Sequence, residues 1–245
     1  MAAEGGGSDG PKVLKILVLG DPGTGKSSII NRYVKGTFSE ATSTTVGVDF
    51  GLKSLRVGGE EIRLQLWDIA GQDRINSNLL RVYYRDAFGV MLVYDISRPQ
   101  TFETVSKWKA TIDAVVEPVP GAQSLPVILV GNKSDVEVPE TEADIGQSDA
   151  FYQYYLKNSA QAGKSQLDSD YLQGFCKDNG FVKWFDVSAS DGTGVNEMMD
   201  FFTNVILKES ATAFELRREQ QAAFRPGQKR GGGEGGLLGS GGGCC

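Results

Sequence analysis

The stretch GDPGTGKS, residues 20–27, constrains this chain more than any other segment. It fits the pattern G-x-x-x-x-G-K-[ST], follows the apolar run VLKILVL and precedes SSIINRYV, whose apolar residues have helical spacing. Glycines let such a loop aim its backbone N–H groups at phosphates, and the following helix adds the positive end of its dipole. We therefore predict a strand, a phosphate loop and a helix that bind a nucleoside triphosphate. Lys26 is expected to reach the outer phosphates and Ser27 to ligate Mg²⁺. The alternative is a glycine-rich turn with an incidental lysine.

The remaining sequence alternates apolar strands with helices. Strands are expected within residues 13–20, 45–57, 60–71, 88–95, 125–135 and 181–189. Helices are expected from residue 26, around 101–116 and around 194–207. The second and third strands are joined by a Gly-Gly turn and should form a hairpin. This order predicts an α/β domain with a mostly parallel sheet, helices on both faces and ligands at the carboxyl ends of its strands.

The composition restricts the class of protein. The 245 residues are 40% hydrophobic and 23% charged, which is typical of one globular domain with tails. Three cysteines are too few for a disulfide framework, and no apolar leader opens the sequence, so we expect a reducing, cytosolic setting. Apolar runs fall short of the roughly 20 residues of a membrane-spanning helix. The formal net charge of −6 argues against nucleic acid as a partner.

The segment GNKSD, residues 131–135, is a candidate base-reading loop. Asn132 and Asp135 are three residues apart, so both can face one planar ligand. A carboxylate accepts hydrogen bonds, and guanine, unlike adenine, offers it both a ring N–H and an exocyclic amino group. The aliphatic stem of Lys133 can cover the base. A polar turn at a strand end is the alternative, and a phosphate-loop ATPase or kinase is the competing enzyme class.

The segment WDIAGQD, residues 67–73, ends the third strand with candidate γ-phosphate sensors. Asp68 is expected to hold Mg²⁺ through water. Gly71 has no side chain to keep its N–H from the γ-phosphate, and Gln72 can orient the attacking water. Gln72 is thus the predicted catalytic residue.

These motifs, with TTVGVDF, RVYYRDA and LVYDIS, resemble the small GTPases of the Ras superfamily and, more closely, the Rab family. The resemblance covers residues 12–210 and implies a P-loop small G-domain, whose six-stranded sheet has one antiparallel strand. It implies that Thr45 binds Mg²⁺ and senses the γ-phosphate, and that the N–H of Ala189, in the loop 188–190, meets the base carbonyl. WDIAGQ and FCKDNGFVKWF are similar to the Rab thirty-two/thirty-eight branch. The candidate residues are Asp21, Pro22, Gly23, Thr24, Gly25, Lys26, Ser27, Ser28, Thr45 and Gly71 for phosphates; Asn132, Lys133, Asp135, Ser188, Ala189 and Ser190 for guanine; and Ser27, Thr45 and, through water, Asp68 for Mg²⁺.

The resemblance also implies a function. We expect a switch that hydrolyses GTP to GDP slowly unaided, that a GTPase-activating protein accelerates, and that recruits effectors in its GTP form to regulate vesicle and organelle trafficking. An exchange factor, a GDP-dissociation inhibitor and a Rab escort protein are the other expected partners. The expected location is the cytosolic face of endosomal, lysosome-related, Golgi-derived or mitochondria-associated membranes, with a cycling cytosolic pool. A G-protein that has lost its activity and acts as a scaffold is the alternative.

Several segments depart from the family pattern or have two interpretations. Ser190 replaces the usual lysine of the last guanine loop, Pro22 occupies a phosphate-loop position that influences hydrolysis, and residues 136–166 contain an insertion. We expect the insertion to be an extra surface helix; a partner site is the alternative. The resemblance favours an exposed effector patch for four residues that could otherwise be core or surface: Val46, Phe50, Trp67 and Tyr83.

Both ends of the chain are expected to be tails. Residues 1–11 are glycine-rich and acidic, which favours disorder, and residues 211–245 are expected to be flexible. The basic stretch 216–230 is either a solvated helix end and linker or a segment that is weakly attracted to anionic lipid. Adjacent Cys244 and Cys245 could suggest a disulfide or zinc, but the resemblance implies that both are geranylgeranylated. Two lipid chains anchor a protein stably, whereas one binds marginally.

Overall fold

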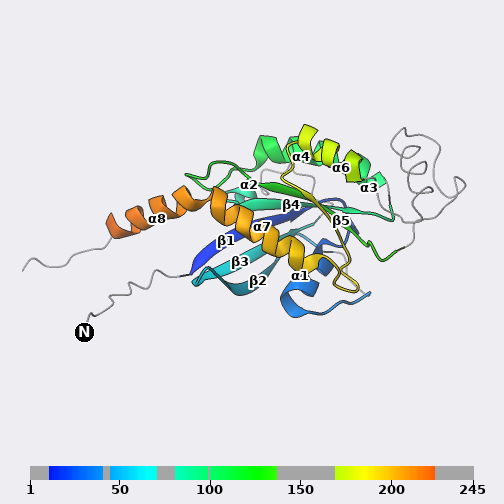
Figure 1. Ribbon diagram of the computed structural model, residues 1–245, viewed down its shortest axis with the longest axis horizontal. Coiled ribbons are helices and arrows are strands. Elements are labelled where there is room, and N and C mark those ends of the chain that lie inside the picture. The colour runs from blue at the N-terminus through cyan, green and yellow to red at the C-terminus, as the bar shows by residue number, and fades with distance from the viewer. Residues whose placement is uncertain (1–10, 41–44, 71–80, 99, 137–168, 224–245) are drawn as a thin grey trace, which may run out of the picture.

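A six-stranded sheet with helices on both faces forms the fold in the computed structural model (Figure 1), which describes residues 11–40, 45–70, 81–98, 100–136 and 169–223. The strand order is β2-β3-β1-β4-β5-β6, and every neighbouring pair is parallel except β2 and β3. The strands are β1 (Lys12–Leu19), β2 (Val48–Val57), β3 (Glu60–Ile69), β4 (Gly89–Asp95), β5 (Val127–Asn132) and β6 (Trp184–Val187). The helices are α1 (Lys26–Lys35), α2 (Arg81–Tyr84), α3 (Gln100–Glu103), α4 (Val105–Val115), α6 (Ser169–Asp178), α7 (Val195–Glu209) and α8 (Ala211–Ala223).

The predicted fold class is confirmed, and the burial of the strands explains their order. Every residue of β4 and β5 is buried, as expected for parallel strands covered on both faces. Strand β2 alternates between half-buried and exposed residues over most of its length because it lies at an edge of the sheet. Gly58 and Gly59 join β2 to β3 with φ values of 59° and 87°, the positive values that a two-residue hairpin turn of type I′ requires.

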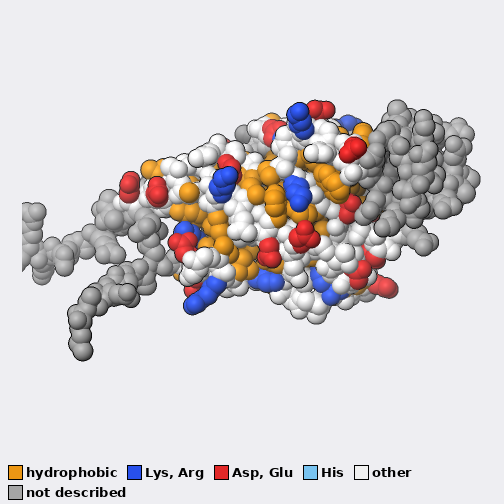
Figure 2. Space-filling model, in the orientation of Figure 1, with side chains coloured by type: hydrophobic (Ala, Val, Ile, Leu, Met, Phe, Trp, Pro, Cys, Tyr) orange, Lys and Arg blue, Asp and Glu red, His pale blue; other side chains and the backbone are white. Residues whose placement is uncertain are grey.

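Two apolar cores lie on opposite faces of the sheet. Helices α1 and α7 cover one face, where Ile29, Tyr33 and Phe202 are buried. Helices α2, α3, α4 and α6 cover the other face. Cys176, in α6, belongs to this second core, and burial raises the pKa of its thiol to about 11. The thiol is therefore protonated at neutral pH. Over the described residues in Figure 2, basic and acidic side chains are interspersed with apolar ones.

The C-terminal part of the described chain differs from the flexible tail expected from residue 211. Helix α8 occupies Ala211–Ala223, where Ala213 is fully buried. The ring of Phe214 stacks on Phe88, with 5.3 Å between their centroids, and the ammonium of Lys12 lies 5.1 Å from the centre of the Phe214 ring. These contacts hold the beginning of α8 against the amino ends of β1 and β4. The expected N-terminal tail up to residue 10, most of the insertion, and the predicted lipidation sites Cys244 and Cys245 lie outside the described residues.

The carboxyl ends of the strands lie at the opposite edge of the sheet from α8. The phosphate loop follows β1, the base-reading loop follows β5, and the loop 188–190 follows β6. Parallel strands bring these three segments together although they are distant in sequence. Among the described residues, none of the helices is both long enough and apolar enough to cross a membrane.

Candidate nucleotide-binding site

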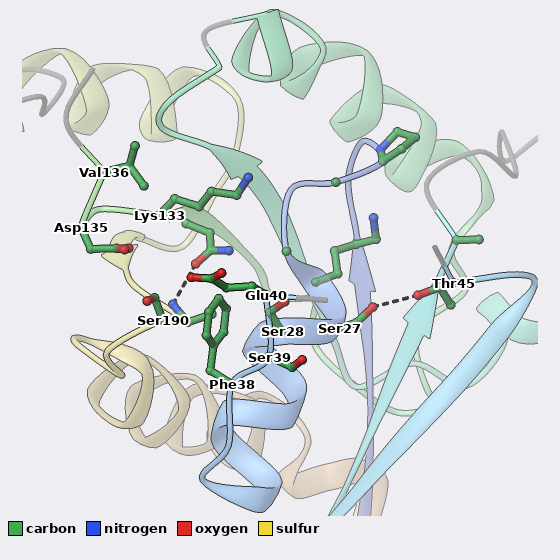
Figure 3. A pocket seen from close by; sticks show the side chains of 17 residues that line it. Ser27, Ser28, Phe38, Ser39, Glu40, Thr45, Lys133, Asp135, Val136 and Ser190 are labelled. Carbon is green, nitrogen blue, oxygen red and sulfur yellow. Dashed lines mark hydrogen bonds between the residues drawn. The ribbon is translucent and has the colours of Figure 1, made fainter. Parts of the chain in front are cut away.

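A cavity of about 630 Å³ lies at the carboxyl ends of the strands (Figure 3). This volume is within the range typical of small-molecule sites. The phosphate loop and α1 form one end, and the segments after β5 and β6 form the other. The lining residues are Pro22, Gly23, Gly25, Lys26, Ser27, Ser28, Phe38, Ser39, Glu40, Thr45, Ala70, Asn132, Lys133, Asp135, Val136, Ala189 and Ser190.

Two positions in the phosphate loop require glycine. Gly20 has φ of 136°, and a Cβ atom there would lie 2.0 Å from the carbonyl oxygen of Val93. Gly25 has φ of 89°, and its Cβ atom would lie 2.1 Å from Nδ2 of Asn132. Any other residue would therefore clash and strain the backbone. The glycines thus let the phosphate loop approach both β4 and the base-reading loop closely.

Lys26 is buried inside the phosphate loop. Its ammonium donates hydrogen bonds to the carbonyl oxygens of Gly20 and Asp21, at 2.9 and 3.0 Å. Burial lowers the pKa of Lys26, and the nearby carboxylates of Asp68 and Asp21 partly oppose that shift. An anionic ligand would supply the compensating charge that the carbonyl oxygens supply incompletely.

The side chain of Asp21 does not line the cavity but ties the phosphate loop to α4. Its carboxylate accepts hydrogen bonds from the hydroxyl of Thr104 and the indole N–H of Trp108, both at 2.8 Å. Thr24 is also buried, and its hydroxyl donates to the carbonyl oxygen of Asp21 at 3.0 Å. The side chains of these two predicted phosphate-binding residues therefore support the loop, which leaves their backbone N–H groups for a ligand.

Ser27, Thr45 and Asp68 meet at one corner of the site. The hydroxyl oxygens of Ser27 and Thr45 are 2.8 Å apart, and both donate to Oδ2 of Asp68, from Thr45 at 3.2 Å. Burial raises the pKa of Asp68, while the hydrogen bond from Ser27 and the charge of Lys26 oppose the rise.

This corner fits a Mg²⁺ ion. Oδ1 of Asp68 is buried without a hydrogen-bond partner among the described residues, so a cation or its water would satisfy it. Within those residues there is no cluster of three His, Cys, Asp or Glu. One carboxylate and two hydroxyls suit Mg²⁺, which usually combines few protein ligands with waters and substrate phosphates.

Asn132 joins the phosphate loop to the loop after β6. Its amide nitrogen donates to the carbonyl oxygen of Thr24 at 2.9 Å, and its Oδ1 accepts from the backbone N–H of Ala189 at 3.1 Å. Asn132 is almost completely buried. Three segments that are distant in sequence are thereby held at fixed separations around the cavity.

Asp95, at the end of β4, fixes Lys133, the residue that follows Asn132 in the base-reading loop. Its buried carboxylate lies 2.7 Å from Nζ of Lys133 and 2.7 Å from Nε of Arg98. Arg98 also donates to the carbonyl oxygen of Pro22 at 3.1 Å. Lys133 has φ of 68°, which is uncommon for a residue with a side chain, and the ion pair helps hold it there. Asp95 therefore connects Lys133 to the phosphate loop.

The structure brings together most of the predicted site residues. Lys26 and Ser27 line the same cavity as Asn132, Asp135 and Ala189. The hydroxyl of Ser188 instead accepts a hydrogen bond from the N–H of Asp191, at 3.1 Å. Gly71 and the predicted catalytic Gln72 lie outside the described residues.

Sequence reasoning missed several residues that shape the cavity. Phe38 and Glu40 lie in the labelled group that points into it in Figure 3, although no motif spacing identifies them. Asp95 and Arg98 were missed because their contacts join segments that are distant in sequence. An aromatic residue that follows α1 by three positions is the one local signal for Phe38, and that signal is weak.

An aromatic patch lies near the candidate Mg²⁺ site and consists of the exposed Phe50 and Tyr83 and the half-buried Trp67. The ring centroids of Phe50 and Trp67 are 6.1 Å apart, and those of Trp67 and Tyr83 are 5.9 Å apart. Phe50 is 59% exposed, so it is not a core residue, and Val46 beside Thr45 is 92% exposed. The ammonium of Lys15 lies 4.4 Å from the centre of the Trp67 ring. Burial lowers the pKa of Lys15, and the negative charge of Asp86 partly opposes that shift. Trp67 therefore has a fixed position between two aromatic residues and a cation.

The mostly parallel sheet, the phosphate loop and the base-reading loop define an α/β nucleotide-binding domain. Residues 15–208 match the Ras family. The chain is 41% identical over 216 residues to "Ras-related protein Rab-32A" of Dictyostelium discoideum, covering 87% of this chain and 85% of that protein. It is 41% identical over 196 residues to "Ras-related protein Rab-32" of Homo sapiens, covering 80% and 75%. It is 33% identical over 199 residues to "Ras-related protein Rab-7L1" of Rattus norvegicus, covering 81% and 84%.

The chain therefore belongs to the Ras family, and within it to the Rab-family small GTPases, which are GTP-binding switches in membrane trafficking. The predicted likeness to the Rab thirty-two/thirty-eight branch is confirmed, because Rab-32 proteins are among its most similar relatives.

Proposed function

We propose that this cavity binds GTP·Mg²⁺ with its base toward Asp135 and its phosphates toward Lys26, and that the chain hydrolyses GTP to GDP as a Rab-type switch. The observation that carries the proposal is the convergence of two motifs about a hundred residues apart on one cavity. A phosphate loop alone suits any nucleoside triphosphate, whereas Asp135 on the same cavity supplies the acceptor that suits guanine.

The base end has two walls. Phe38 lies on one side of the cavity, and the stem of Lys133 follows the other (Figure 3). A purine between them would bury both of its faces, and the carboxylate of Asp135 would meet its edge. The N–H of Ala189, which donates to Asn132 in this structure, would have to exchange that hydrogen bond for one to the base carbonyl. Asp135 is exposed in this structure, and a base seated between the walls would cover its carboxylate; adenine would then leave that carboxylate without a donor.

The phosphate end contains the residues that would respond to the presence or loss of the γ-phosphate. Ser27 and Thr45, with Asp68 through water, would hold Mg²⁺, which neutralises charge that develops on the transferred phosphoryl group. Thr45 precedes the exposed Val46 and the β2 residue Phe50, so a contact of Thr45 with the γ-phosphate side would order the segment leading to the aromatic patch. Loss of the γ-phosphate would release that segment. Gly71 and Gln72 are proposed to complete the γ-phosphate site and to orient the attacking water.

The aromatic patch is the proposed effector contact, comprising Phe50, Trp67, Tyr83 and neighbouring Val46. Its support is the exposure of Val46, Phe50 and Tyr83 next to the segment proposed to sense the nucleotide, with the half-buried Trp67 ring between Phe50 and Tyr83. We further propose that an exchange factor and a GTPase-activating protein regulate the cycle, because unaided phosphoryl transfer in such sites is slow.

The proposed membrane anchor is a pair of prenyl groups on Cys244 and Cys245, delivered with an escort protein and extracted by a GDP-dissociation inhibitor. Helix α8 leaves the domain at the amino ends of the strands, so the chain beyond it starts at the edge opposite the nucleotide cavity. Such an arrangement would keep the switch surfaces accessible while the lipids lie in the cytosolic face of an endosomal or lysosome-related membrane. The likeness to Rab-32 proteins supports a membrane-associated role in trafficking.

A competition experiment with the full chain tests the central part of the proposal. Labelled GDP is bound in the presence of Mg²⁺ and displaced by unlabelled GTP or ATP. We expect GTP to displace it at near-stoichiometric concentration and ATP to fail at about a thousandfold excess, because adenine presents neither of the two donors that suit the Asp135 carboxylate. Equal displacement by ATP would show that the base end does not select guanine.

A further inference from the structure

Arg32 connects the two walls of the base end from outside the cavity. It lies in the last turn of α1 and donates from Nε to the carbonyl oxygen of Ala189 at 2.8 Å. Its Nη2 donates to the carbonyl oxygen of Ser190, and its Nη1 donates to that of Gly36 at 3.0 Å. Three nitrogens of one guanidinium therefore hold three backbone carbonyls in two separate segments.

One of these segments contains the peptide that faces the base end. The N–H of Ala189 donates to Asn132, and its carbonyl oxygen accepts from Arg32, so this residue is fixed on both sides. The rest of the loop closes on itself: the N–H of Ser188 donates to the carbonyl oxygen of Thr193 at 3.0 Å, and that of Gly192 to the carbonyl oxygen of Ser188 at 2.9 Å. The carbonyls of Ala189 and Ser190 turn outward, and Arg32 is the side chain that holds both.

The other segment leads to Phe38. Gly36 ends α1 with φ of 70°, and its N–H donates to the carbonyl oxygen of Arg32 at 3.0 Å. Two residues later, Phe38 lines the cavity. Because the guanidinium is planar and its donors have fixed directions, it sets the separation of the segments that it joins. A change at residue 32 should therefore alter the distance between Phe38 and the loop 188–190.

We infer that Arg32 is a positioning residue for the base end, and that it slows nucleotide release by holding the Ala189–Ser190 loop and the root of the Phe38 segment together. The inference rests on the proposed guanine-nucleotide function. It also explains how a loop with Ser190, a residue whose short side chain has little apolar surface, is kept in place. Arg32 is not among the residues that line the cavity, and it acts on the base end through the lining residues Ala189 and Ser190 and through the segment that leads to Phe38.

A simpler role for Arg32 is a favourable charge at the carboxyl end of a helix. A lysine would serve that role equally well, but its single ammonium cannot bind three carbonyls in fixed directions. Lys35 lies in the same last turn and is exposed, so Lys35→Ala removes an equal charge from the same helix end without touching the loop. Arg32→Lys and Lys35→Ala therefore distinguish the hydrogen bonds of the guanidinium from the effect of a charge at the helix end.

The experiment measures release of labelled GDP and single-turnover hydrolysis of pre-bound GTP in the full chain, for wild type, Arg32→Ala, Arg32→Lys and Lys35→Ala. We expect Arg32→Ala to release GDP about tenfold faster or more, because it removes the charged hydrogen bonds that join the loop to the end of α1. Arg32→Lys should keep most of that increase, and Lys35→Ala should match wild type. Hydrolysis of bound GTP should change less than about twofold, because the phosphate end is untouched.

Four outcomes would overturn the inference. Arg32→Ala could release GDP at the wild-type rate, Arg32→Lys could behave as wild type, or Lys35→Ala could accelerate release as much as Arg32→Ala. If Arg32→Ala lost hydrolysis of bound GTP as well as retention of GDP, the variant would be generally destabilised, and Arg32 would not be a positioning residue. A wild-type chain that binds no guanine nucleotide would instead refute the proposed function, so the two failures are distinguishable.

Discussion

The two ends of the nucleotide cavity are built in different ways. At the phosphate end, one continuous segment of eight residues, 20–27, supplies the loop, the lysine and the serine. At the base end, Phe38, residues 132–136 and residues 189–190 come from three distant segments. The first end depends mainly on backbone geometry at a few glycines, with Asp21 tying the loop to the α4 region. The second depends on long-range polar contacts from Asn132, which lines the cavity, and from Asp95 and Arg32, which do not, so support residues outside the cavity matter more there.

Removing the ammonium at the phosphate end should have the largest effect. Lys26→Ala removes the buried cation that we propose faces the phosphates. We expect GDP affinity to fall by about two to four orders of magnitude, from the loss of two charged hydrogen bonds to phosphate of roughly 1.5–3 kcal/mol each. Titration with labelled GDP measures it. The exposed Lys107→Ala, on α4, is the matched control and should bind as wild type. Retained affinity in Lys26→Ala would mean that the loop backbone binds phosphate without the lysine.

A single methyl group should break the junction between the two ends. Gly25→Ala places a Cβ atom against Nδ2 of Asn132 at a residue with φ of 89°, so either the phosphate loop or the base-reading loop must move. We expect a loss of about 1–3 kcal/mol in GDP binding free energy, measured by calorimetry. Gly174→Ala, in α6, has no atom within 4 Å of its new methyl and should leave binding unchanged. Equal binding by both variants would contradict the close contact of the two loops.

The buried carboxylate that supports Lys133 should have a smaller effect, with a defined pH dependence. Burial alone would raise the pKa of Asp95, but hydrogen bonds from Lys133, Ser97 and Arg98 outweigh it and hold the pKa below its ordinary value. The stabilisation is therefore present above the unfolded pKa, roughly 3.9, and is lost as the pH falls through the lower folded pKa. Asp95→Asn should lower the free energy of unfolding by about 2 kcal/mol at pH 7.

Urea unfolding of wild type and Asp95→Asn at pH 7, 5 and 3 measures this difference. It should be similar at pH 7 and 5 and smaller at pH 3. Asp113→Asn removes an exposed partner of Lys109 and should cost less than about 1 kcal/mol at any of these pH values. A difference between wild type and Asp95→Asn that grows on acidification would contradict the lowered pKa.

The difference between the locally built phosphate end and the base end built from distant segments also explains what the sequence could and could not predict. The strands, the hairpin and the phosphate loop follow from apolar periodicity and glycine spacing, which are local signals. Arg32 and Asp95 have no such signal, because a basic residue near a helix end and an acidic residue at a strand end usually contact solvent. Helix α8 was missed because its sequence is polar and its packing depends mainly on Phe214 reaching Phe88 across the fold.

The most direct test of the central claim is a change of base preference at Asp135. Xanthine presents a carbonyl where guanine presents its exocyclic amino group, so an asparagine amide can donate where the aspartate could accept. Asp135→Asn should therefore bind xanthosine diphosphate better than GDP, while wild type and the exposed control Asp200→Asn should prefer GDP by at least about a hundredfold. Competition between the two nucleotides measures both preferences. If Asp135→Asn kept the wild-type preference for GDP, the base would not lie against Asp135, and the proposed orientation of the nucleotide in this cavity would be wrong.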